Sequence, residues 1–543
     1  MKRMILHPFF FASYAILAFI AYNSVQSISG LRALIISLAV ALVIFISFLV
    51  ITKDSRKAGL ISSVCILMIF SFGHIKGAIS NVGIIGEIFS KDYVLLPILL
   101  LIAVVWIVRV IKTQGRHLGV FTMYFNIVGI ILIVFPISQV LISSVRSDTA
   151  KHWINEYIAL SWEKNGGDFN DNQSEIISHE EFPDIYYILL DSYARSDVLA
   201  ELYEYDNSYF VNFLEEKGFY IAEDSNSNYK TTELSISSSL NMKHINDMPD
   251  YYNRNITTYD SKIIVDTAVE LVSRNKVSQF LKNRGYKIVE FESVYDKIHF
   301  SSSDVNLRSP NIQQVNTNQT IVEEFLLDSS LARLFISSEG KPWYKRADLV
   351  FDNHREQVLY ALDYMASFAG KDGNYFVFSH LVSPHTPYVF GPNCEKISNQ
   401  DPYTLTDMRI GNEKHITYYR DQVHCLNQLL SNAVEEIFKN SSHPPIIIIQ
   451  SDHGSRVYSE KDPEGSIQEQ LDFQILNAYF LPDNDYKMLY SSITPVNSFR
   501  VIFNKYFWTD FSLLNDNSYS LVNREGKLIF IHACEYYGTC FSD

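Results

Sequence analysis

Long apolar runs dominate the first part of the chain. Five of them can be delimited, at residues 8–25, 31–52, 58–74, 93–111 and 119–143. A helix needs about 20 apolar residues to cross a bilayer, so these runs predict five transmembrane helices. The third run is the weakest of the five, because His74 ends it early. A cleaved signal peptide does not fit, since further apolar runs follow the first one.

From Pro183 onward the pattern changes to short apolar strands that alternate with amphipathic helices. Strands are predicted at residues 185–190, 219–222, 287–291, 375–378 and 446–450, and helices at 207–217, 277–283, 352–369 and 417–438. This alternation is typical of an α/β domain with a mostly parallel sheet and helices on both faces. Residues 295–345 are polar and predict no element, so we interpret them as an insertion or a long excursion of the chain.

The stretch between the two parts predicts a helical stalk, at residues 150–160, and then a polar linker. The sequence therefore divides into a transmembrane region at 1–147, a stalk and linker at 148–182, and an α/β domain at 183–543.

Charge divides the chain at the same place. Residues 1–147 contain 12 Lys and Arg against 3 Asp and Glu, a net charge of +9. The formal total is −15, so the remaining residues carry −24. A strongly acidic domain argues against nucleic acid as a partner, because phosphate backbones are bound through Lys and Arg.

Basic residues are distributed unevenly between the two ends of the predicted bundle. One end has Lys2, Arg3, Lys53, Arg56, Lys57, Arg109, Lys112 and Arg116, and the other has only Arg32, Lys76 and Lys91. Cytoplasmic loops are enriched in Lys and Arg, so the amino terminus is predicted to be cytoplasmic. Five spans then place everything after about Ser144 outside the cytoplasm, and the loss of one span would reverse that placement.

Polar side chains follow three of the predicted strands. Asp191 follows the strand at 185–190, His380 and His385 follow that at 375–378, and Asp452 and His453 follow that at 446–450. In a parallel sheet these ends lie along one edge, so distant positions can converge. Taken singly, each residue has an ordinary alternative as a helix cap or a hydrogen-bonded loop residue. Together they favour a metal or phosphate site, and mixed oxygen and nitrogen ligands suit Zn²⁺ or Mn²⁺ better than Ca²⁺.

Two threonines, Thr231 and Thr232, precede a predicted helix at Glu233–Asn241. A hydroxyl at the amino terminus of a helix lies at the positive end of the helix dipole, which favours an anion there. Coordination to a metal would lower the pKa of such a hydroxyl further and make it a nucleophile. A plain threonine N-cap is the ordinary alternative for either residue.

Four of the five cysteines, all except Cys65, lie in the predicted α/β domain. Cys534 and Cys540 are close in sequence and would close a small loop in an oxidising compartment. Free thiols are the alternative, and the spacing alone does not decide between the two.

These motifs resemble those of the membrane-anchored sulfatase-like enzymes of the alkaline phosphatase superfamily, which include phosphoethanolamine and phosphoglycerol transferases. The resemblance covers residues from about 183 to 510. It consists of the Asp after the first strand, the Asn-Tyr-…-Thr segment that starts at Asn228, the His380 and His385 pair, and the Ser-Asp-His-Gly sequence that ends at Gly454. It implies the α/β fold of that superfamily behind the membrane helices.

The resemblance also implies a role for the matching residues. Asp191, Asp452 and His453 would be ligands of one divalent metal ion, Zn²⁺ or Mn²⁺. Thr232 would be the nucleophile and a further ligand of the same ion, with Thr231 as the neighbouring alternative.

His385 and His380 are similar to the histidines that contact the transferred group or protonate the leaving oxygen in that family. Lys230 and Arg456 lie close in sequence to the motifs, and each is either a contact of the substrate phosphate or a solvated surface charge.

Two departures from the family pattern restrict the chemistry. No cysteine stands in the Cys-x-Pro-x-Arg motif of formylglycine sulfatases, which disfavours sulfate ester hydrolysis, and no second set of metal ligands can be assigned.

The expected activity is transfer of a phospho-substituent, of phosphoethanolamine or phosphoglycerol type, from a phospholipid donor to an envelope glycan or lipid. It would proceed through a phosphothreonine at Thr232, on the extracytoplasmic face of the plasma (inner) membrane. A phosphodiesterase, phosphatase or sulfatase-like hydrolase with water as acceptor is the alternative among enzymes. A catalytically silent envelope assembly protein is the alternative of another class, although it would not need the complete set of site residues.

Overall fold

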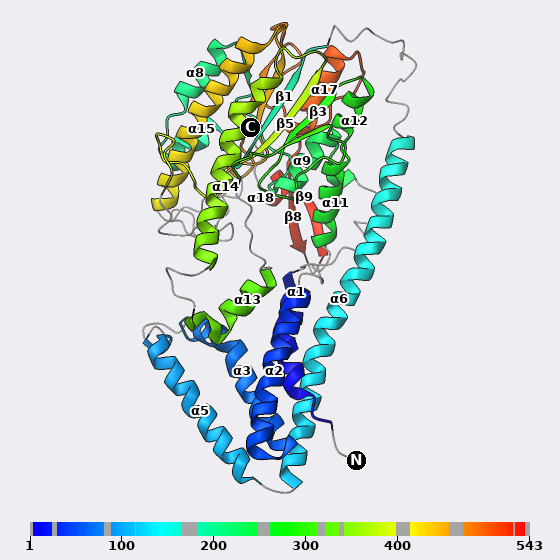
Figure 1. Cartoon of the computed structure of the whole chain (residues 1–543). Helices are drawn as coiled ribbons and strands as arrows, with labels where there is room; N and C mark the ends of the chain where they lie inside the picture. Colours follow the sequence, from blue (N-terminus) through cyan, green and yellow to red (C-terminus); the bar gives the residue numbers. More distant parts are fainter. Residues whose placement is uncertain are drawn as a thin grey trace. The chain divides into compact units, whose positions relative to one another are not determined.

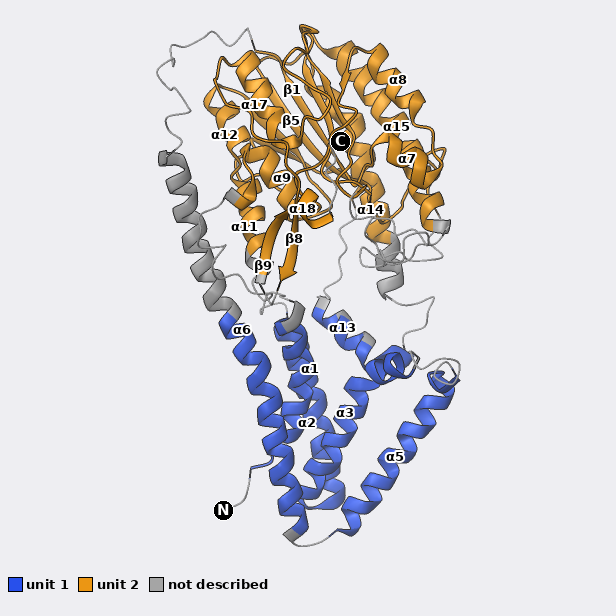
Figure 2. Cartoon of the chain, turned by 180° about the vertical axis from the view of Figure 1, so that it is seen from behind, with its two compact units in different colours: residues 1–149, 315–347 blue, residues 150–314, 348–543 orange. Residues whose placement is uncertain are grey.

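The computed structural model of the 543-residue chain describes residues 4–23, 30–80, 88–113, 116–164, 182–247, 261–312, 321–335, 342–397, 413–455, 471–524 and 527–537 (Figure 1). The chain forms two compact units (Figure 2). Unit 1 comprises residues 1–149 and 315–347, and unit 2 comprises residues 150–314 and 348–543.

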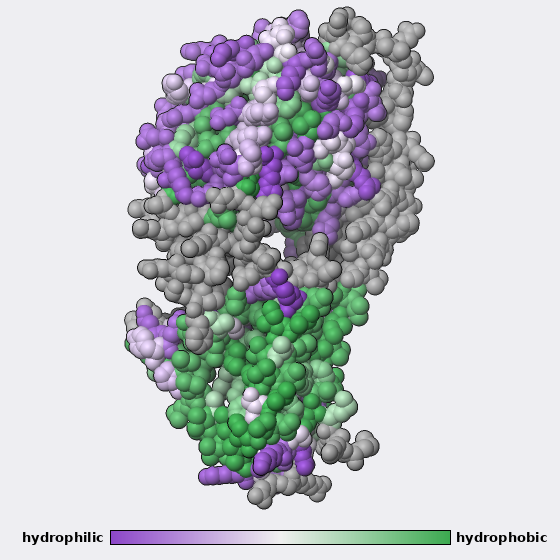
Figure 3. Space-filling view, viewed as in Figure 1, coloured by the Kyte–Doolittle hydropathy of each residue, from purple (hydrophilic) through white to green (hydrophobic). Residues whose placement is uncertain are grey.

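Unit 1 is built from the apolar helices that the hydrophobic pattern predicts. Its elements are α1 (His7–Asn23), α2 (Leu31–Thr52), α3 (Ser55–Ser80), α5 (Asp92–Lys112), the first part of α6 (Arg116–Lys164), α13 (Ile321–Ser329) and η5 (Leu331–Phe335). Large apolar side chains on the surface of this unit are more than half exposed, among them Val50, Leu101 and Ile131. Figure 3 shows that apolar residues dominate its surface, as is typical of helices that face lipid.

Four of these helices are long and apolar enough to cross a membrane, at residues 31–52, 55–79, 92–112 and 117–142. They correspond to four of the five predicted spans, and they mark the chain as a membrane protein. The third span is longer than the apolar run that His74 ends, because α3 continues to Ser80 and the His74 ring packs against Phe325. The fifth predicted span forms α1, which has 17 residues.

The short helix α1 is nevertheless part of the bundle. Phe11, Ala12 and Ile16 are buried in one apolar cluster with residues of α2 and α3. The side-chain oxygen of Asn126 in α6 accepts hydrogen bonds from the backbone N–H groups of Leu6 and His7, at 3.1 and 3.0 Å. These donors stand at the start of the helix and have no partner within it, so Asn126 caps α1 inside the bundle.

Unit 2 contains a seven-stranded sheet of order β2-β7-β6-β1-β5-β3-β4. The strands are β1 (Ile185–Asp191), β2 (Tyr220–Ile221), β3 (Lys287–Phe291), β4 (Val305–Leu307), β5 (Tyr375–Pro384), β6 (Ile446–Ser451) and β7 (Asn477–Phe480). Adjacent strands from β6 to β4 pair in parallel, and β7 pairs antiparallel with both β6 and β2. The prediction of a mostly parallel sheet is therefore confirmed.

Helices cover both faces of this sheet (Figure 1). One group consists of α9 (Thr232–Asn241), α11 (Ser261–Ser273), α12 (Lys276–Asn283) and α17 (Pro495–Tyr506), and the other of α7 (Ser196–Tyr203), α8 (Ser208–Glu216), α14 (Pro342–Tyr364) and α15 (Glu413–Asn440). Short 3₁₀ turns lie at Ile245–Asp247 (η3) and Met365–Phe368 (η6). Because helices shield both faces, the central strands need near-continuous apolar sequence, and β1, β5 and β6 are buried along their whole length.

Alternate residues of β1 face the two helix layers. Ile185, Tyr187 and Leu189 belong to the buried apolar cluster that includes residues of α9, α12 and α17. The hydroxyl group of Tyr187 donates to the side-chain oxygen of Gln450 at 2.8 Å, which satisfies two buried polar groups and ties β1 to β6. This packing fixes α9 against the central strands.

A carboxyl-terminal hairpin packs against the segment that contains α9. It consists of β8 (Tyr519–Arg524) and β9 (Lys527–His532), followed by α18 (Ala533–Tyr537). Leu521 and Phe530 pack against a buried cluster that contains Tyr229 and Leu234, and the backbone N–H of Tyr519 donates to the carbonyl of Asn228 at 2.9 Å. The hairpin thereby supports the loop that leads into α9.

Two of the cysteines form a bond that the sequence analysis did not predict. Cys394, in the loop after β5, is joined by a disulfide to Cys425 of α15. Cys534 is also disulfide-bonded, which excludes the free thiol for that residue, and its predicted partner Cys540 lies outside the described residues. Disulfides persist in oxidising compartments, so the Cys394–Cys425 bond supports a position of unit 2 outside the cytoplasm.

Glu290 of β3 is expected to make the stability of unit 2 depend on pH. Both of its carboxylate oxygens accept the backbone N–H of Phe300, at 3.0 Å each, and burial raises the pKa of this carboxyl group to about 7. The folded state therefore holds the proton more tightly than the unfolded chain, and stability is lost as pH rises from about 4.5 through 7. Glu290→Gln keeps an acceptor for Phe300 but cannot ionise. Its free energy of unfolding should exceed that of the parent at pH 8 by on the order of 3 kcal/mol, and by much less at pH 5.

Urea unfolding in detergent, followed by tryptophan fluorescence at both pH values, measures this difference. Glu201→Gln, which changes an exposed glutamate of α7, serves as the matched control and should follow the parent. Equal pH dependence in the Glu290→Gln protein and the parent would contradict the assignment.

Candidate metal centre and active site

Three neighbouring strands bring the predicted site residues to one edge of the sheet. β1 lies between β6 and β5, with Leu190 opposite Ser451 and Leu189 opposite His380. Asp191 is the last residue of β1, and Asp452 comes directly after β6. Residues that are more than 250 positions apart in the sequence therefore become neighbours, as the pattern of strand ends predicts.

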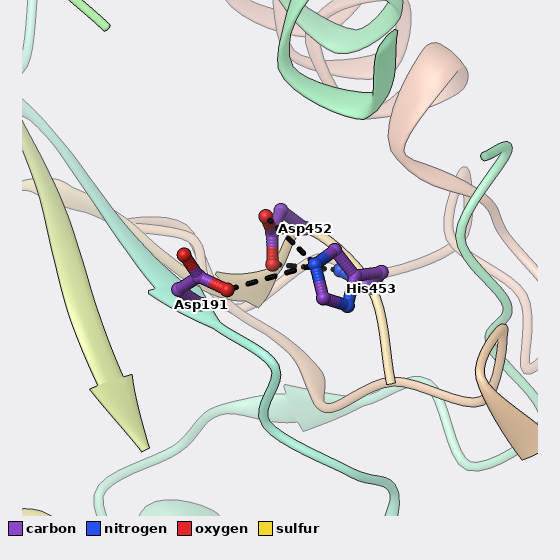
Figure 4. A group of neighbouring side chains, drawn as sticks. All are labelled: Asp191, Asp452 and His453. Atoms are coloured by element: carbon purple, nitrogen blue, oxygen red, sulfur yellow. Dashed lines mark hydrogen bonds and ion pairs between the residues drawn. The ribbon is translucent and has the colours of Figure 1, made fainter. Parts of the chain in front are cut away.

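Asp191, Asp452 and His453 form a buried group whose potential ligand atoms all lie within 4.8 Å of one another (Figure 4). Nε2 of His453 is 3.6 Å from Oδ1 of Asp191 and 3.6 Å from Oδ2 of Asp452. None of the three residues is more than 3% exposed. In the described part of the chain, this is the group of His, Cys, Asp and Glu residues that could hold a metal ion.

Thr232 completes this group. It is the first residue of α9, and its Oγ1 lies 3.5 Å from Nε2 of His453. Thr231 occupies the N-cap position in extended conformation, but its side chain makes no capping bond and its buried hydroxyl has no hydrogen-bond partner among the described residues. The geometry thus brings Thr232, and not Thr231, to the carboxylates and the imidazole.

The imidazole of His453 is oriented by its second nitrogen. Nδ1 lies 2.8 Å from the carbonyl oxygen of Gly454, a contact in which the ring must be the donor. A proton on Nδ1 leaves Nε2 with a lone pair that points at the carboxylates. Histidine ligands in metal sites are commonly held in this way by a backbone carbonyl.

The two buried carboxylates repel each other, so a cation between them would stabilise the site. The pKa of Asp452 is raised well above its usual range, first by burial and then by the negative charge of Asp191. Hydrogen bonds from the backbone N–H groups of Ser192 and His453 hold Oδ1 of Asp452 at 3.1 and 2.8 Å, and Thr232 also lowers its pKa. Oδ2 of Asp452 is buried and makes no hydrogen bond of normal geometry with the part of the chain that the structure describes.

These residues fit one divalent metal ion. Two carboxylates, one imidazole nitrogen and one hydroxyl offer four ligands, and Oδ2 of Asp452 is a buried oxygen without a hydrogen-bond donor of normal geometry among the described residues. Zn²⁺ accepts such oxygen and nitrogen ligands in tetrahedral sites, and Mn²⁺ accepts the same donor types. Asp191, Asp452, His453 and Thr232 are therefore the residues that would hold the ion.

His380 lies behind Asp191 and is fully buried. Its Nδ1 is 2.8 Å from Oγ of Ser293, and its Nε2 is 3.7 Å from Oδ2 of Asp191. Burial, and then the proximity of His385, lower the pKa of His380 to about 3, so its imidazole is neutral at pH 7. With Ser293 donating to Nδ1, the proton on Nε2 faces Asp191, which suits His380 to orienting that carboxylate.

His385 is half-buried and is fixed through its backbone and one ring nitrogen. Its backbone N–H donates to the carbonyl of Asp191 at 3.0 Å, and its carbonyl accepts from the amide of Gln422 at 3.1 Å. Nδ1 lies 2.6 Å from the carbonyl of Thr386, so the proton is on Nδ1 in the neutral ring. Nε2 is then the nitrogen that can exchange a proton with a substrate.

The two predicted substrate cations differ in their surroundings. Nζ of Lys230 is 2.8 Å from the hydroxyl group of Tyr537 and lies over the rings of Phe473 and Tyr537. Arg456 lies outside the described residues. Asn228, in the same motif as Lys230, has a structural part: its side chain contacts Thr494 at 3.0 Å and accepts from the backbone of Val496 at 2.9 Å.

The sequence analysis missed a second polar group next to Thr232. Glu233 follows Thr232 in α9, and its carboxylate accepts hydrogen bonds from the hydroxyl of Tyr295 and from Nζ of Lys297, the latter at 3.0 Å. Burial raises the pKa of Glu233, but these two donors and the helix backbone outweigh burial and hold it below its usual value. Tyr295 and Lys297 fall in the polar stretch that predicts no element, so no periodic signal marks them.

Comparison with known proteins identifies the family. The model of the sulfatase family matches residues 187–488, and the chain belongs to that family. The matched range contains all of the candidate metal ligands and both site histidines. Unit 2 therefore carries most of a sulfatase-like enzyme domain. No curated protein matches the chain.

Several solved structures are similar to the chain at low sequence identity. The C-terminal periplasmic domain of EcEptC from Escherichia coli is 10% identical over 65% of this chain and 93% of that one, with a TM-score of 0.36. Phosphoethanolamine transferase EptC from Campylobacter jejuni, as its C-terminal periplasmic domain, is 13% identical over 61% and 92%, with a TM-score of 0.34. The soluble domain of lipooligosaccharide phosphoethanolamine transferase A from Neisseria meningitidis is 11% identical over 59% and 87%, with a TM-score of 0.37.

We predict that the purified protein binds one Zn²⁺ or Mn²⁺ per chain, and that Asp452→Asn and His453→Ala each lose it. Each change removes one of four ligands and leaves the others too few to retain the ion against a chelator. Elemental analysis after mild chelation and gel filtration measures the metal content. Asp510→Asn and His443→Ala, which change exposed residues of the same types, should retain the ion. Full occupancy in both site variants would refute the ligand assignment.

Proposed function

We propose that the protein is a membrane-bound transferase that moves a phospho-substituent, of phosphoethanolamine or phosphoglycerol type, from a phospholipid to a hydroxyl group of an envelope glycan or lipid. The observation that carries this proposal is the position of the Thr232 hydroxyl, 3.5 Å from His453 and beside the buried carboxylates. Membership of the sulfatase family supports ester chemistry at this site. The lack of the Cys-x-Pro-x-Arg motif favours a phosphate ester over a sulfate ester.

Thr232 is suited to attack phosphorus. A divalent ion at this centre would supply Lewis-acid stabilisation of the phosphoryl oxygens and would lower the pKa of the ligating hydroxyl. The position of Thr232 at the amino terminus of α9 adds the positive end of the helix dipole, which favours both an alkoxide and an anionic phosphate.

In the first half-reaction Thr232, which has lost its hydroxyl proton to solvent, forms a bond from its oxygen to phosphorus while the bond between phosphorus and the diacylglycerol oxygen breaks. The departing oxygen takes a proton from Nε2 of His385, which must enter this step protonated. Diacylglycerol leaves, and the phospho-substituent stays on Thr232 as a phosphodiester. His385 can serve here because its backbone is bonded to that of Asp191 and its side chain is only half-buried.

In the second half-reaction the acceptor hydroxyl attacks the same phosphorus. Its proton passes to Nε2 of His385, the bond between phosphorus and Thr232 breaks, and Thr232 leaves as the alkoxide in which it entered the first half-reaction. His380 positions Asp191 throughout, since its neutral ring faces that carboxylate. Lys230, two residues before the nucleophile, and Arg456 are our candidates for contacts with the substrate phosphate.

The site also weighs against a catalytically silent protein. A protein with only an assembly role has no need to bury two carboxylates side by side, because that arrangement costs stability unless a cation binds between them. The position that we propose for the domain is the extracytoplasmic face of the plasma membrane. The Cys394–Cys425 disulfide and the uneven distribution of basic residues between the loops support it.

We predict that Thr232→Ala abolishes transfer, by roughly 10³-fold or more, because it removes the atom that forms the covalent bond. Thr232→Ser keeps an oxygen in place and should retain measurable activity. Incubation with labelled phosphatidylethanolamine and phosphatidylglycerol, followed by mass spectrometry of the peptide that contains Thr232, should show the added group and identify it by its mass.

Thr231→Ala is the matched control, since the Thr231 hydroxyl makes no hydrogen bond in the described structure and its loss should leave most of the transfer intact. A dead Thr231→Ala protein beside an active Thr232→Ala protein would shift the nucleophile by one residue. Normal transfer by both variants would exclude the covalent mechanism. Release of the group to water in the presence of glycan and lipid acceptors would identify a hydrolase instead.

A further inference from the structure

A segment from inside the matched sulfatase range belongs to unit 1. The family match runs from residue 187 to 488 without a break, yet residues 315–347 lie in the same compact unit as the membrane helices. Figure 2 shows α13 of this segment in the colour of unit 1, beside α1 and α3. The chain thus leaves unit 2 after Gln314, enters unit 1, and returns at Asp348.

Apolar side chains seat α13 on the membrane helices. Val322 and Leu326 are 0% and 6% exposed, and both belong to the buried cluster formed by residues of α1, α2 and α3. The ring of Phe325 stacks on that of Phe19 in α1, with 4.2 Å between the centroids, and lies 5.6 Å from the ring of His74 in α3. One face of a nine-residue helix is therefore packed against three different helices of unit 1.

An ion pair accompanies these contacts, in which the carboxylate is buried and the guanidinium is half-exposed. The carboxylate of Glu323 in α13 meets the guanidinium of Arg32 in the first turn of α2 through two parallel contacts, Nε to Oε1 and Nη2 to Oε2. The side chain of Glu323 is 7% exposed. A bidentate pair of this kind fixes both the position and the direction of the helix, whereas apolar contacts alone allow sliding.

All of these contacts lie at one end of the bundle. Phe19 is near the carboxyl end of α1, Arg32 is at the start of α2, and His74 is near the end of α3. Consecutive helices joined by short loops run in opposite directions, so these three positions are at the same level. This is the end whose loops are poor in Lys and Arg, which is the outer end according to the distribution of basic residues.

We propose that residues 321–335 are an anchor that binds the outer end of the membrane helices and keeps the catalytic unit at the membrane surface, where its lipid donor lies. The part of this proposal that concerns the donor rests on the proposed function. α6 gives the catalytic unit one covalent link to the membrane helices, and the anchor adds two more at residues 314–315 and 347–348. A second attachment restricts the volume that the active site can explore and raises the effective concentration of a membrane-bound substrate, without changing the chemistry at Thr232.

The docking is tested in the full-length protein in its native membrane. Phe19→Cys and Phe325→Cys are combined in a Cys65→Ser background and treated with a short bifunctional thiol reagent. Mass spectrometry of the digested protein should show the peptides that contain positions 19 and 325 joined within one chain. Addition of Glu323→Arg should abolish the link, and further addition of Arg32→Glu should restore it. Absence of the link in the protein with both charges intact would overturn the proposal.

The role of the anchor is tested with two substrates that differ in their attachment to the membrane. Arg32→Glu and Glu323→Arg should each lower transfer from phosphatidylethanolamine or phosphatidylglycerol in membranes by about tenfold, and the double exchange should restore it. Turnover of soluble bis(p-nitrophenyl) phosphate should stay unchanged in all three proteins. Exchange of Lys76 and Asp92, an ion pair of unit 1 at 2.7 Å that does not involve the anchor, is the matched control and should leave both activities intact.

Each outcome separates the anchor from the proposed function. Loss of both activities in the single variants without rescue by the double exchange would mean that the pair only supports folding, and would overturn the anchor. Full transfer from lipid in both single variants would overturn it as well. If the parent protein moves no group from either lipid, the proposed function fails, while the crosslink still decides whether the segment is docked.

Discussion

The rest of the site depends on two carboxylates that are buried next to each other. Asp191 ends β1, and Asp452 follows the adjacent strand β6, so the strand order itself forces these two acids together. Burial and mutual repulsion both oppose their ionisation, which is why the pKa of Asp452 is so strongly raised. Such a pair becomes stable when a cation lies between its oxygens. The orientation of His453 through Gly454 and the position of Thr232 at the start of α9 both follow from that demand, because each directs a further donor to the same point.

Much of this site was predictable because its residues stand at the ends of unmistakable strands. A run such as Ile446–Ile449 is apolar on both faces, which marks a central strand covered by two helix layers, and polar residues directly after it must reach the edge of the sheet. The sequence does not specify the order of the strands. The prediction that their ends converge succeeded because β6, β1 and β5 are the most apolar strands and therefore occupy the centre together. The helix that starts at Thr232 was predictable from local sequence as well, because threonine is a common residue at the amino terminus of a helix.

Contacts between irregular segments could not be predicted. Tyr295 and Lys297 bind Glu233 from a stretch without periodic pattern, and the disulfide between Cys394 and Cys425 joins a loop to a helix 31 residues later. Neither contact follows from hydrophobic spacing, because both depend on the tertiary packing of helices and loops. Cys534 and Cys540 suggest a pair because they are close in sequence, whereas the disulfide between Cys394 and Cys425 closes a longer loop.

Some basic residues of the membrane helices stand on the side where the distribution of charge predicts few of them, and the structure explains two of these exceptions. Arg32 and Lys76 are two of the three basic residues on the side that the distribution of charge assigns to the outside. In the structure each of them faces a carboxylate, Glu323 for Arg32 and Asp92 for Lys76. Their charges are therefore balanced where they stand, and they weaken the orientation signal less than isolated cations would. The partner of Arg32 is 291 residues away in the sequence. The charge of Arg32 near the start of α2 is therefore explained only by the position of α13 beside it.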